Sequence, residues 1–273
     1  MRNLKLGDRM KEFYENVPKM HLMRRTPVIV RIDGKAFHTF TRGFAKPFDK
    51  CMIESMQETT LDLCNSVQGC VFGYTQSDEI SLILVDYFKF DTEAFFGYEV
   101  QKICSICASM ATLYFNRHFS DHVAKFLETN YEKVGKKEIY GDESERVEKL
   151  VKAYEKAMKI GGMFDARCFN LPKEEVANYI LWRQQDATRN SIFGLGQAFF
   201  SPKKLHGKNT SEIQDMLMTT YNINWNNYPT PCKRGTSVIK NDGKYVIDKD
   251  MPIIKGEDRA YVEKYVIFET EEN

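Results

Sequence analysis

The stretch that decides the fold is GCVFGYTQSDEISLILV, residues 69–85. It contains two strand-like runs, 69–75 and 80–85, separated by the polar tetrad QSDE at 76–79. Two such runs joined by a few polar residues are typical of a β-hairpin. We therefore predict two antiparallel strands here, with an aspartate and a glutamate at the turn.

The segments around this hairpin predict the remaining strands and helices. The β-branched run PVIVRI (27–32) ends at the turn pair Asp33-Gly34 and is typical of a strand. The other segments with helical or strand-like patterns are the helices at 49–67, 97–117 and 172–190 and the strand at 164–169. The order strand, helix, strand, strand, helix, strand is that of the ferredoxin-like βαββαβ arrangement, so we predict an α+β fold.

This topology brings two aspartates together. The first and second strands run parallel, and the third lies between them, antiparallel to both. The end of the first strand therefore shares a sheet edge with the hairpin turn, and Asp33 and Asp78 are predicted to face each other there. Neighbouring carboxylates repel each other, so they occur either with raised pKa values or around divalent cations. A plain turn at Asp33 and a plain polar loop at Asp78 are the alternatives.

The chemistry that suits such a pair is phosphoryl transfer. Two Mg²⁺ ions bridged by two aspartates stabilise the attacking and leaving oxygens of a phosphoryl displacement. The loop GKAFHTF (34–40) begins with a glycine that permits close backbone approach, and its N–H groups are suited to a triphosphate. The sequence therefore predicts a magnesium and triphosphate site at this edge.

Charge is unevenly distributed along a chain that is nearly neutral as a whole. The 273 residues carry a net charge of +1, with 42% hydrophobic and 28% charged residues, as in ordinary globular proteins. Residues 1–50 hold 12 Lys and Arg against 5 Asp and Glu, and residues 201–240 hold 6 against 2, whereas residues 51–100 hold 1 against 9. Basic segments around an acidic centre fit a site that gathers phosphates around metal ions. Solvated surface faces are the alternative.

The sequence also indicates a cellular compartment. No run approaches the ~20 apolar residues of a membrane span, and the start MRNLKLGDRMKEF lacks the apolar core of a secretory signal. We therefore expect a cytoplasmic protein with no membrane segment. An odd number of cysteines, 7, favours free thiols over a disulfide framework. For the C-x-x-C of Cys104 and Cys107, buried core thiols are expected rather than a redox pair or half of a zinc site.

Five blocks of the chain resemble the signatures of one known family. They are RIDGKAFHTF (31–40), FAKPFDK (44–50), YTQSDEISLIL (74–84), WRQQDATRNSI (182–192) and YNINWNNYPTPCKRGT (221–236). In order and spacing they are similar to the blocks of the tRNA-His guanylyltransferase family. The resemblance implies a polymerase-type palm with additional helices, and nucleotide addition in the 3′-to-5′ direction onto the 5′ end of a tRNA.

A domain organisation follows from these observations. We expect a palm-type catalytic domain over residues 1–240, with a charged helical insertion at about 120–160. Residues 241–273 hold 5 Lys and Arg against 9 Asp and Glu. We expect them to form an acidic C-terminal extension packed on the same domain.

The resemblance also implies roles for single residues. Asp33, the carbonyl of Gly34 and Asp78 would hold two Mg²⁺ ions, and Glu79 would support these catalytic groups from beside them. The residues implied to bind ATP, GTP or another nucleoside triphosphate are Gly34, Lys35, Ala36, Phe37, His38, Lys46, Asp49, Ser77, Lys102 and Asn190. An ordinary core aromatic is the alternative for Phe37, and an ordinary surface lysine for Lys102.

One departure from the family pattern affects the expected substrate. Where eukaryotic members carry HINNLYN, this chain reads TRNSIFG (188–194), with Thr188 in place of the histidine. It is similar in this to the Thg1-like bacterial and archaeal proteins, whose implied role is template-directed repair of 5′-truncated tRNA. The resemblance thus favours repair, with a 5′-monophosphate end first activated by ATP. Dedicated guanylate addition to tRNA-His is the alternative.

Two segments are candidates for RNA contact. The block 221–236 combines aromatic side chains with asparagines and ends in a basic pair, so it is suited to bases and phosphates, and 203–208 is a basic loop. The predicted RNA-binding residues are Lys203, Lys204, Lys208, Asn224, Lys233 and Arg234. A hydrogen-bonded turn that supports the palm and a solvated loop are the alternatives.

We therefore predict a nucleotidyltransferase whose substrates are tRNA and nucleoside triphosphates, and the resemblance implies a homotetramer. Another palm enzyme, such as a nucleotide cyclase, and a non-catalytic RNA-binding protein are the competing functions. A cyclase should turn over nucleoside triphosphate without RNA, and a binder should hold tRNA equally well without Mg²⁺.

Overall fold

A single antiparallel sheet organises the chain. The computed structural model describes residues 4–135 and 142–269, and within them the strands follow the order β4-β1-β3-β2-β5-β6. All neighbouring strands pair antiparallel. The strands are β1 (Val28–Gly34), β2 (Cys70–Gln76), β3 (Glu79–Leu84), β4 (Phe164–Asn170), β5 (Thr236–Asn241) and β6 (Lys244–Asp248).

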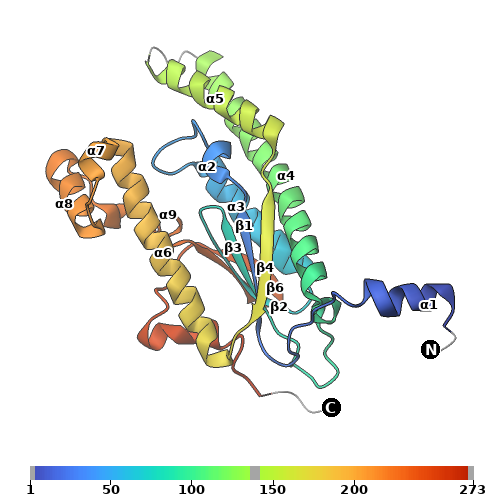
Figure 1. The fold of residues 1–273 in the computed structure, drawn as a ribbon. Helices are drawn as coiled ribbons and strands as arrows, with labels where there is room; N and C mark the ends of the chain where they lie inside the picture. The colour runs from blue at the N-terminus through green and yellow to red at the C-terminus, as the bar shows by residue number, and fades with distance from the viewer. Residues whose placement is uncertain (1–3, 136–141, 270–273) are drawn as a thin grey trace.

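Helices cover both faces of this sheet. On one face lie α3 (Lys50–Ser66) and α4 (Val100–Gly135), and on the other α6 (Lys173–Phe199) and α10 (Ala260–Glu263) (Figure 1). The helices that extend beyond the sheet are α5 (Asp142–Ile160) and α8 (Thr210–Tyr221). The short helices and helical turns are α1 (Leu6–Met10), η1 (Lys11–Glu15), α2 (Phe37–Phe40), η2 (Phe95–Tyr98), α7 (Pro202–Leu205), η3 (Trp225–Asn227), α9 (Thr230–Arg234) and η4 (Gly256–Arg259).

The predicted α+β class and the predicted order of elements are confirmed. Strands β1 to β4 lie in the order β4-β1-β3-β2, with α3 between β1 and β2 and with α4 and α5 between β3 and β4. The helix expected at 172–190 is longer than predicted. It continues to Phe199 because Ile192 and Leu195 extend its apolar stripe and pack against Ile213 and Leu217 of α8.

Alternation along β1 decides which side chains reach the site. Val28, Val30 and Ile32 are buried against α3 and α4, whereas Ile29 is buried against α6. Successive residues of a strand point to opposite faces of the sheet. Arg31 and Asp33 therefore lie on the face that α6 covers.

The segment 241–273 packs on the same sheet. β6 pairs with β5, and Val262 of α10 and Val266 are buried in the core beneath α6. The sequence did not predict these two strands as part of the sheet. The charged segment expected as a helical insertion contains the second half of α4 and α5.

The cysteines and the helices bear on two further expectations. Cys107 is fully buried in the core, and the sulfur of Cys104 lies 3.7 Å from that of Cys168. Burial raises the pKa of the Cys107 thiol to about 12, so it behaves as a core side chain. Of the helices in residues 4–135 and 142–269, none is both long and apolar enough to cross a bilayer.

Candidate active site at the β1–β3 edge

The end of β1 and the β2–β3 turn meet at one edge of the sheet. Asp33 pairs in register with Glu79, and the amide of Gly34 donates a 3.0 Å hydrogen bond to the carbonyl oxygen of Asp78. The structure thus brings Asp33 and Asp78 together as the topology predicts. The turn that carries Asp78 is tight, and its first residue, Ser77, has a positive φ of 51°.

The electrostatics of this edge show two carboxylates close enough to affect each other. Burial is the main cause that raises the pKa of Asp78 above its ordinary value, and the charge of Asp33 raises it further. A hydrogen bond from the Ser77 hydroxyl, 3.0 Å from Asp78 Oδ1, opposes this rise. A partly desolvated carboxylate beside a second one favours a cation between them.

The donor set fits Mg²⁺ bound together with a substrate. Across residues 4–135 and 142–269 there is no cluster of three or more His, Cys, Asp or Glu side chains that would cage a metal ion on its own. Mg²⁺ is instead typically held by one or two carboxylates together with waters and substrate phosphates. Asp33 and Asp78, with the carbonyl of Gly34 between them in sequence order, match that pattern.

Glu79 has a different environment from the two aspartates. It is buried, and Arg183 of α6 donates two hydrogen bonds to its carboxylate, at 2.7 and 2.8 Å. A second guanidinium, that of Arg31, lies 2.8 Å from Glu79 Oε2. Burial raises the pKa of Glu79 and the two arginines lower it. The oxygens of Glu79 are thus occupied by guanidinium groups, beside the edge that carries Asp33 and Asp78.

The loop after β1 forms the wall of a hollow. A Cβ on Gly34 would lie 2.4 Å from a ring carbon of Phe37, so this position requires glycine. Phe37 is itself buried against Phe40, Phe115 and Phe164, and its ring is a core aromatic. The aromatic alternative is therefore correct for its side chain, which leaves its backbone amide for a ligand.

Three backbone amides of this loop are available. Ala36 adopts a left-handed conformation with φ 54° and turns the chain into α2. Among the described residues, the amides of Ala36, Phe37 and His38 donate to no protein acceptor, whereas the Lys35 amide donates to the carbonyl of Met163. Successive free amides at a helix start favour an anion.

Two adjoining cavities occupy this region. The first, of about 420 Å³, is lined by Gly34, Ala36, Phe37, His38, Thr41, Met52, Ser77 and Asp78. The second, of about 320 Å³, shares Thr41, Met52 and Ser77 with the first. Its lining also includes Lys46, Asp49, Asn190 and Lys233. The metal edge therefore opens into a pocket of the size that small-molecule sites have.

The predicted nucleotide residues of the second cavity do different things. Asp49 caps α3: its carboxylate accepts hydrogen bonds from the amides of Ala45 and Met52 and from the Tyr154 hydroxyl. Asp49 thus holds the 45–49 loop in shape, and the exposed Lys46 of this loop presents the charge. Asn190, on α6, donates a 3.2 Å bond to Asp186 and faces the cavity.

Lys102 is not brought to these cavities, and its predicted place in the site is corrected. It is exposed near the start of α4, where it lies 3.9 Å from Glu99. Thirteen residues separate it from Phe115, the α4 residue whose ring meets Phe37. At 1.5 Å per residue this is about 20 Å along the helix. The surface-lysine alternative describes its place in this chain.

The predicted RNA residues gather around the far end of α6. Lys203 and Lys204 are exposed on α7, while Lys208 lies 2.8 Å from Glu212 and its charge is partly balanced. The side-chain amide oxygen of Asn224 accepts a hydrogen bond from the Asn226 amide and caps the turn η3, as the turn alternative describes. Lys233 donates to the carbonyl of Asn226, and burial lowers its pKa.

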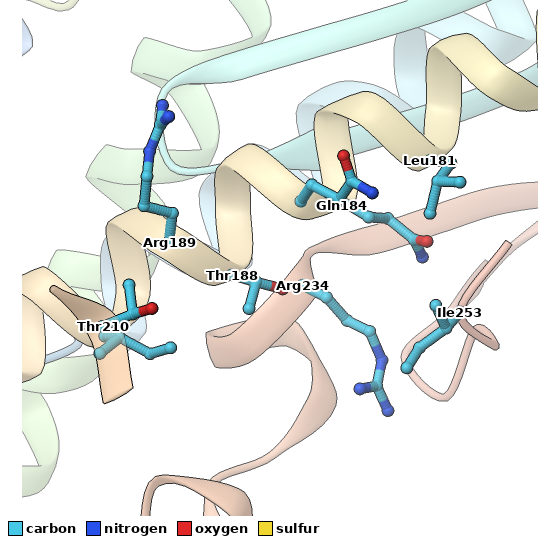
Figure 2. Close-up of a pocket in the computed structure, with 9 residues that line it drawn as sticks. Leu181, Gln184, Thr188, Arg189, Thr210, Arg234 and Ile253 are labelled. Atoms are coloured by element: carbon cyan, nitrogen blue, oxygen red, sulfur yellow. The ribbon is translucent and has the colours of Figure 1, made fainter. Parts of the chain in front are cut away.

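Arg234 lines a third cavity, of about 300 Å³, on a different face of α6 (Figure 2). Thr188 and Arg189 line the same cavity, whereas Asn190 lines the second cavity. The Nε atom of Arg234 is buried without a hydrogen-bond partner among the described residues. Thr188, at the position of the family histidine, therefore lies with the predicted RNA residue Arg234 rather than at the first or second cavity.

Sequence reasoning missed the cations that support the site. Arg31, Arg167 and Arg183 lie within 4 Å of Glu79 or Asp33. A signal was present, because Arg31 interrupts an otherwise apolar strand and a buried glutamate needs a cationic partner. Nothing local in the sequence indicated which arginines would meet it.

Together, the sheet with its two edge carboxylates and the cavity of about 420 Å³ beside them define a palm-type nucleotidyltransferase. Residues 7–172 match the family described as tRNAHis guanylyltransferase. This match covers more than half of the chain, and the chain belongs to that family.

Similar proteins agree with this assignment. A solved bacterial tRNA(His) guanylyltransferase (Thg1)-like protein in complex with ATP is 41% identical, with a TM-score of 0.79, over 97% of this chain and 100% of that one. A second such structure, in complex with GTP, is 36% identical, with a TM-score of 0.73, over 96% and 99% of the two chains. The probable tRNA(His) guanylyltransferase of Dictyostelium discoideum is 26% identical over 89% of this chain and 86% of its own length.

Proposed function

We propose that this protein adds nucleotides in the 3′-to-5′ direction to the 5′ end of tRNA, directed by the opposing strand, and so repairs 5′-truncated tRNA. The observation that carries the proposal is that Asp33, at the end of β1, lies beside the β2–β3 turn, whose Asp78 lines the first of the two adjoining cavities. The ATP and GTP complexes of similar structures support a nucleoside triphosphate as the occupant of these cavities.

The chain offers a distinct contact for each part of that nucleotide. The free amides of Ala36, Phe37 and His38 donate hydrogen bonds to the triphosphate, and Lys46 adds positive charge beside it. Asn190 binds the nucleoside in the second cavity, and Asp49 and Ser77 keep the walls in place.

Asp33, Asp78 and the carbonyl of Gly34 would hold the two Mg²⁺ ions. The ions, when bound, neutralise the developing negative charge on the attacking and leaving oxygens. Glu79 does not bind them in this proposal, because Arg183 and Arg31 occupy its carboxylate.

The reaction runs in two steps on one acceptor end. An oxygen of the RNA 5′-monophosphate forms a bond to the α-phosphorus of ATP, the bond to the bridging oxygen breaks, and pyrophosphate leaves. The 3′-hydroxyl of the incoming nucleotide then loses its proton and bonds to the activated RNA phosphate, and AMP leaves. The chain positions both reactants at Asp33 and Asp78.

Repair is favoured over dedicated guanylate addition by Thr188, which lines the cavity with Arg234. A threonine there removes the aromatic nitrogen that a histidine would offer to RNA. Dedicated addition to tRNA-His is the second candidate, and the family description favours it. We propose that the tRNA contacts Lys203, Lys204, Lys208, Asn224, Lys233 and Arg234, that the protein works as a homotetramer, and that it acts in the cytoplasm.

The test is incubation with Mg²⁺, labelled nucleoside triphosphates and tRNAs that lack the 5′-terminal nucleotide, with each of the four bases opposite the gap. Repair predicts addition of the complementary nucleotide, and guanylate addition alone predicts G whatever base lies opposite. Asp33→Ala and Asp78→Ala should each lose activity, while Asp121→Ala, an exposed aspartate on α4, should not. Activity within tenfold of wild type in either site variant contradicts the two-metal proposal.

Two further arms test the competing functions. Turnover of nucleoside triphosphate without RNA indicates a cyclase. Retention of tRNA without any extension, with and without Mg²⁺, indicates a non-catalytic binder.

A further inference from the structure

A charged and aromatic surface lies beside Asp33 on the face of the sheet that α6 covers. It is formed by Arg31, Asp165, Arg167 and Trp182, and is called here the Trp182–Arg167 surface. Arg31 and Arg167 are directly opposite each other in the β1–β4 pairing, and Asp33 is opposite Asp165. None of these four residues lines the first or the second cavity described above.

Arg167 is held only by weak partners. Its side chain is 53% exposed, and its guanidinium lies 3.2 Å from Asp165 Oδ1 and 3.9 Å from Asp33 Oδ2. Ion pairs this exposed contribute little to stability. The guanidinium is therefore able to turn to a stronger, desolvated anion at no great cost to the fold.

A second arginine, Arg31, lies directly opposite Arg167 on the neighbouring strand. Like charges directly opposite each other across two strands destabilise a sheet. Arg31 has Glu79 as a partner, yet its Nε atom is buried without a hydrogen-bond partner among the described residues. Arg31 thus keeps one N–H donor that no described acceptor uses, and the exposed guanidinium of Arg167 beside it is open to an anion.

Trp182 supplies a second kind of contact at the same place. Its indole is 51% exposed on α6, and the guanidinium groups of Arg183 and Arg31 lie 4.4 and 5.9 Å from the ring centre. Half of this large ring thus remains open to a ligand. Nucleobases of single-stranded or frayed RNA stack on such rings.

We propose that the Trp182–Arg167 surface binds the 5′-terminal nucleotide of the acceptor RNA, with its 5′-phosphate on Arg167 and its base stacked on Trp182. This inference rests on the proposed function, because the RNA phosphate must reach a nucleoside triphosphate bound at Asp33. A phosphate dianion approaching Asp33 and Asp165 is repelled by both carboxylates. Arg167, which lies between these two carboxylates, removes that repulsion.

The first measurement is RNA affinity without Mg²⁺ or nucleotide. The probe is a tRNA that lacks its 5′-terminal nucleotide, prepared with a 5′-monophosphate and with a 5′-hydroxyl. Arg167→Gln should weaken binding of the monophosphate form about tenfold, and binding of the hydroxyl form less than twofold. The matched control is Arg117→Gln, an exposed arginine on α4, which should affect both forms equally.

The second measurement follows Trp182 directly. The chain has 2 tryptophans, Trp182 and Trp225, so Trp225→Phe leaves Trp182 as the reporter. RNA should quench its emission, and ATP alone should not. Trp182→Ala should weaken binding of both RNA forms about tenfold, and Trp182→Phe, which keeps a stacking ring, should restore most of it.

These outcomes separate this inference from the function on which it rests. If Arg167→Gln lowers affinity for both RNA forms equally, or if RNA leaves Trp182 emission unchanged, the proposed surface is wrong. If Arg167→Gln extends tRNA with the same KM for RNA as the wild type, the proposed surface is wrong and the proposed function still stands. Two results together would support the surface and refute the proposed function. Arg167→Gln would bind the monophosphate and hydroxyl RNAs equally well, and the wild-type protein would extend no tRNA.

Discussion

Replacing Arg183 by methionine is expected to destabilise the protein in a strongly pH-dependent way. Arg183 and Glu79 are almost completely buried, and the guanidinium donates bonds of 2.7 and 2.8 Å to the carboxylate. Methionine keeps much of the side-chain volume but removes the charge. The carboxylate then remains in the core with Arg31 as its remaining cationic partner.

The size of the effect follows from the burial of the pair. Removing one partner of a buried ion pair costs about 3–5 kcal/mol, because the other charge is left uncompensated. Since Arg31 still contacts Glu79, we expect the lower end of this range, about 3 kcal/mol. The matched control is Lys208→Met: its ion pair with Glu212 has a similar distance, 2.8 Å, but is 40% exposed. An exposed pair is worth less than about 1 kcal/mol.

The pH dependence follows from the pKa of Glu79. Burial raises this pKa in the wild type against the opposing effect of the arginines, and loss of Arg183 raises it further. A carboxyl whose pKa is higher in the folded than in the unfolded state stabilises the fold fully at pH values below its unfolded pKa. This stabilisation is lost as the pH rises through the folded pKa. The cost of Arg183→Met should therefore be largest at pH 8 and shrink toward pH 5.

The assay is urea unfolding followed by far-UV circular dichroism at pH 5 to 8, since Trp182 contacts Arg183 and its fluorescence reports more than unfolding. Glu79→Gln combined with Arg183→Met should recover part of the lost stability at pH 8, because the buried carboxylate is gone while Arg31 keeps an amide oxygen as acceptor. A cost for Arg183→Met no larger than that of Lys208→Met, or one that does not vary with pH, refutes the reasoning.

Three other changes test the hollow, the RNA surface and the metal edge. Gly34→Ala places a Cβ 2.4 Å from the buried ring of Phe37, so urea unfolding should show a loss of about 1–3 kcal/mol, and an unchanged midpoint contradicts the packing argument. Replacing Lys203 and Lys204 by glutamine should flatten the slope of log tRNA affinity against log salt by roughly 2, and an equal slope rules out phosphate contact there. Asp78→Asn should raise the thermal unfolding midpoint of metal-free protein at pH 7, because burial raises the pKa of this carboxyl and its ionised form opposes folding.

Each of these changes has an internal control. Gly7→Ala meets no atom within 4 Å and should leave the unfolding midpoint in place. Lys208→Gln should flatten the salt slope by less than one, because Glu212 already balances that lysine. The advantage of Asp78→Asn should vanish below pH 4, where the wild-type carboxyl is protonated. An advantage that persists there has a cause other than charge.

The edge carboxylates were predictable because the rules that place them are short-ranged. The hairpin turn around Asp78 is local, and the alternation along β1 together with the chain order fixes which edge Asp33 reaches. The partners of Glu79 were not predictable in this way. Arg183 lies 104 residues away in sequence, and only the packing of α6 across the sheet selects it.

Other errors have equally physical causes. β5 and β6 are short and mix apolar with charged residues, so their pattern resembles a loop, and they form strands because β2 offers a free edge for pairing. Lys102 matched a family position on a helix, but a motif match carries no information about where along a 36-residue helix the site lies. Thr188 and Asn190 are two residues apart and face different cavities. Side chains two positions apart on an α-helix point in directions that differ by about 200° around the helix axis.

Helix α6 contributes residues to each part of the site at this edge. Arg183 donates hydrogen bonds to Glu79, Asn190 lines the second cavity, and Trp182 lies above the strand that ends in Asp33. Trp182 and Asn190 are eight residues apart, which is about 12 Å along the helix axis. Because the buried Glu79–Arg183 pair locks the rotation of α6 on the sheet, it also sets the distance between the proposed RNA end and the proposed nucleotide. The stability of that pair and the geometry of nucleotide transfer therefore depend on the same contact.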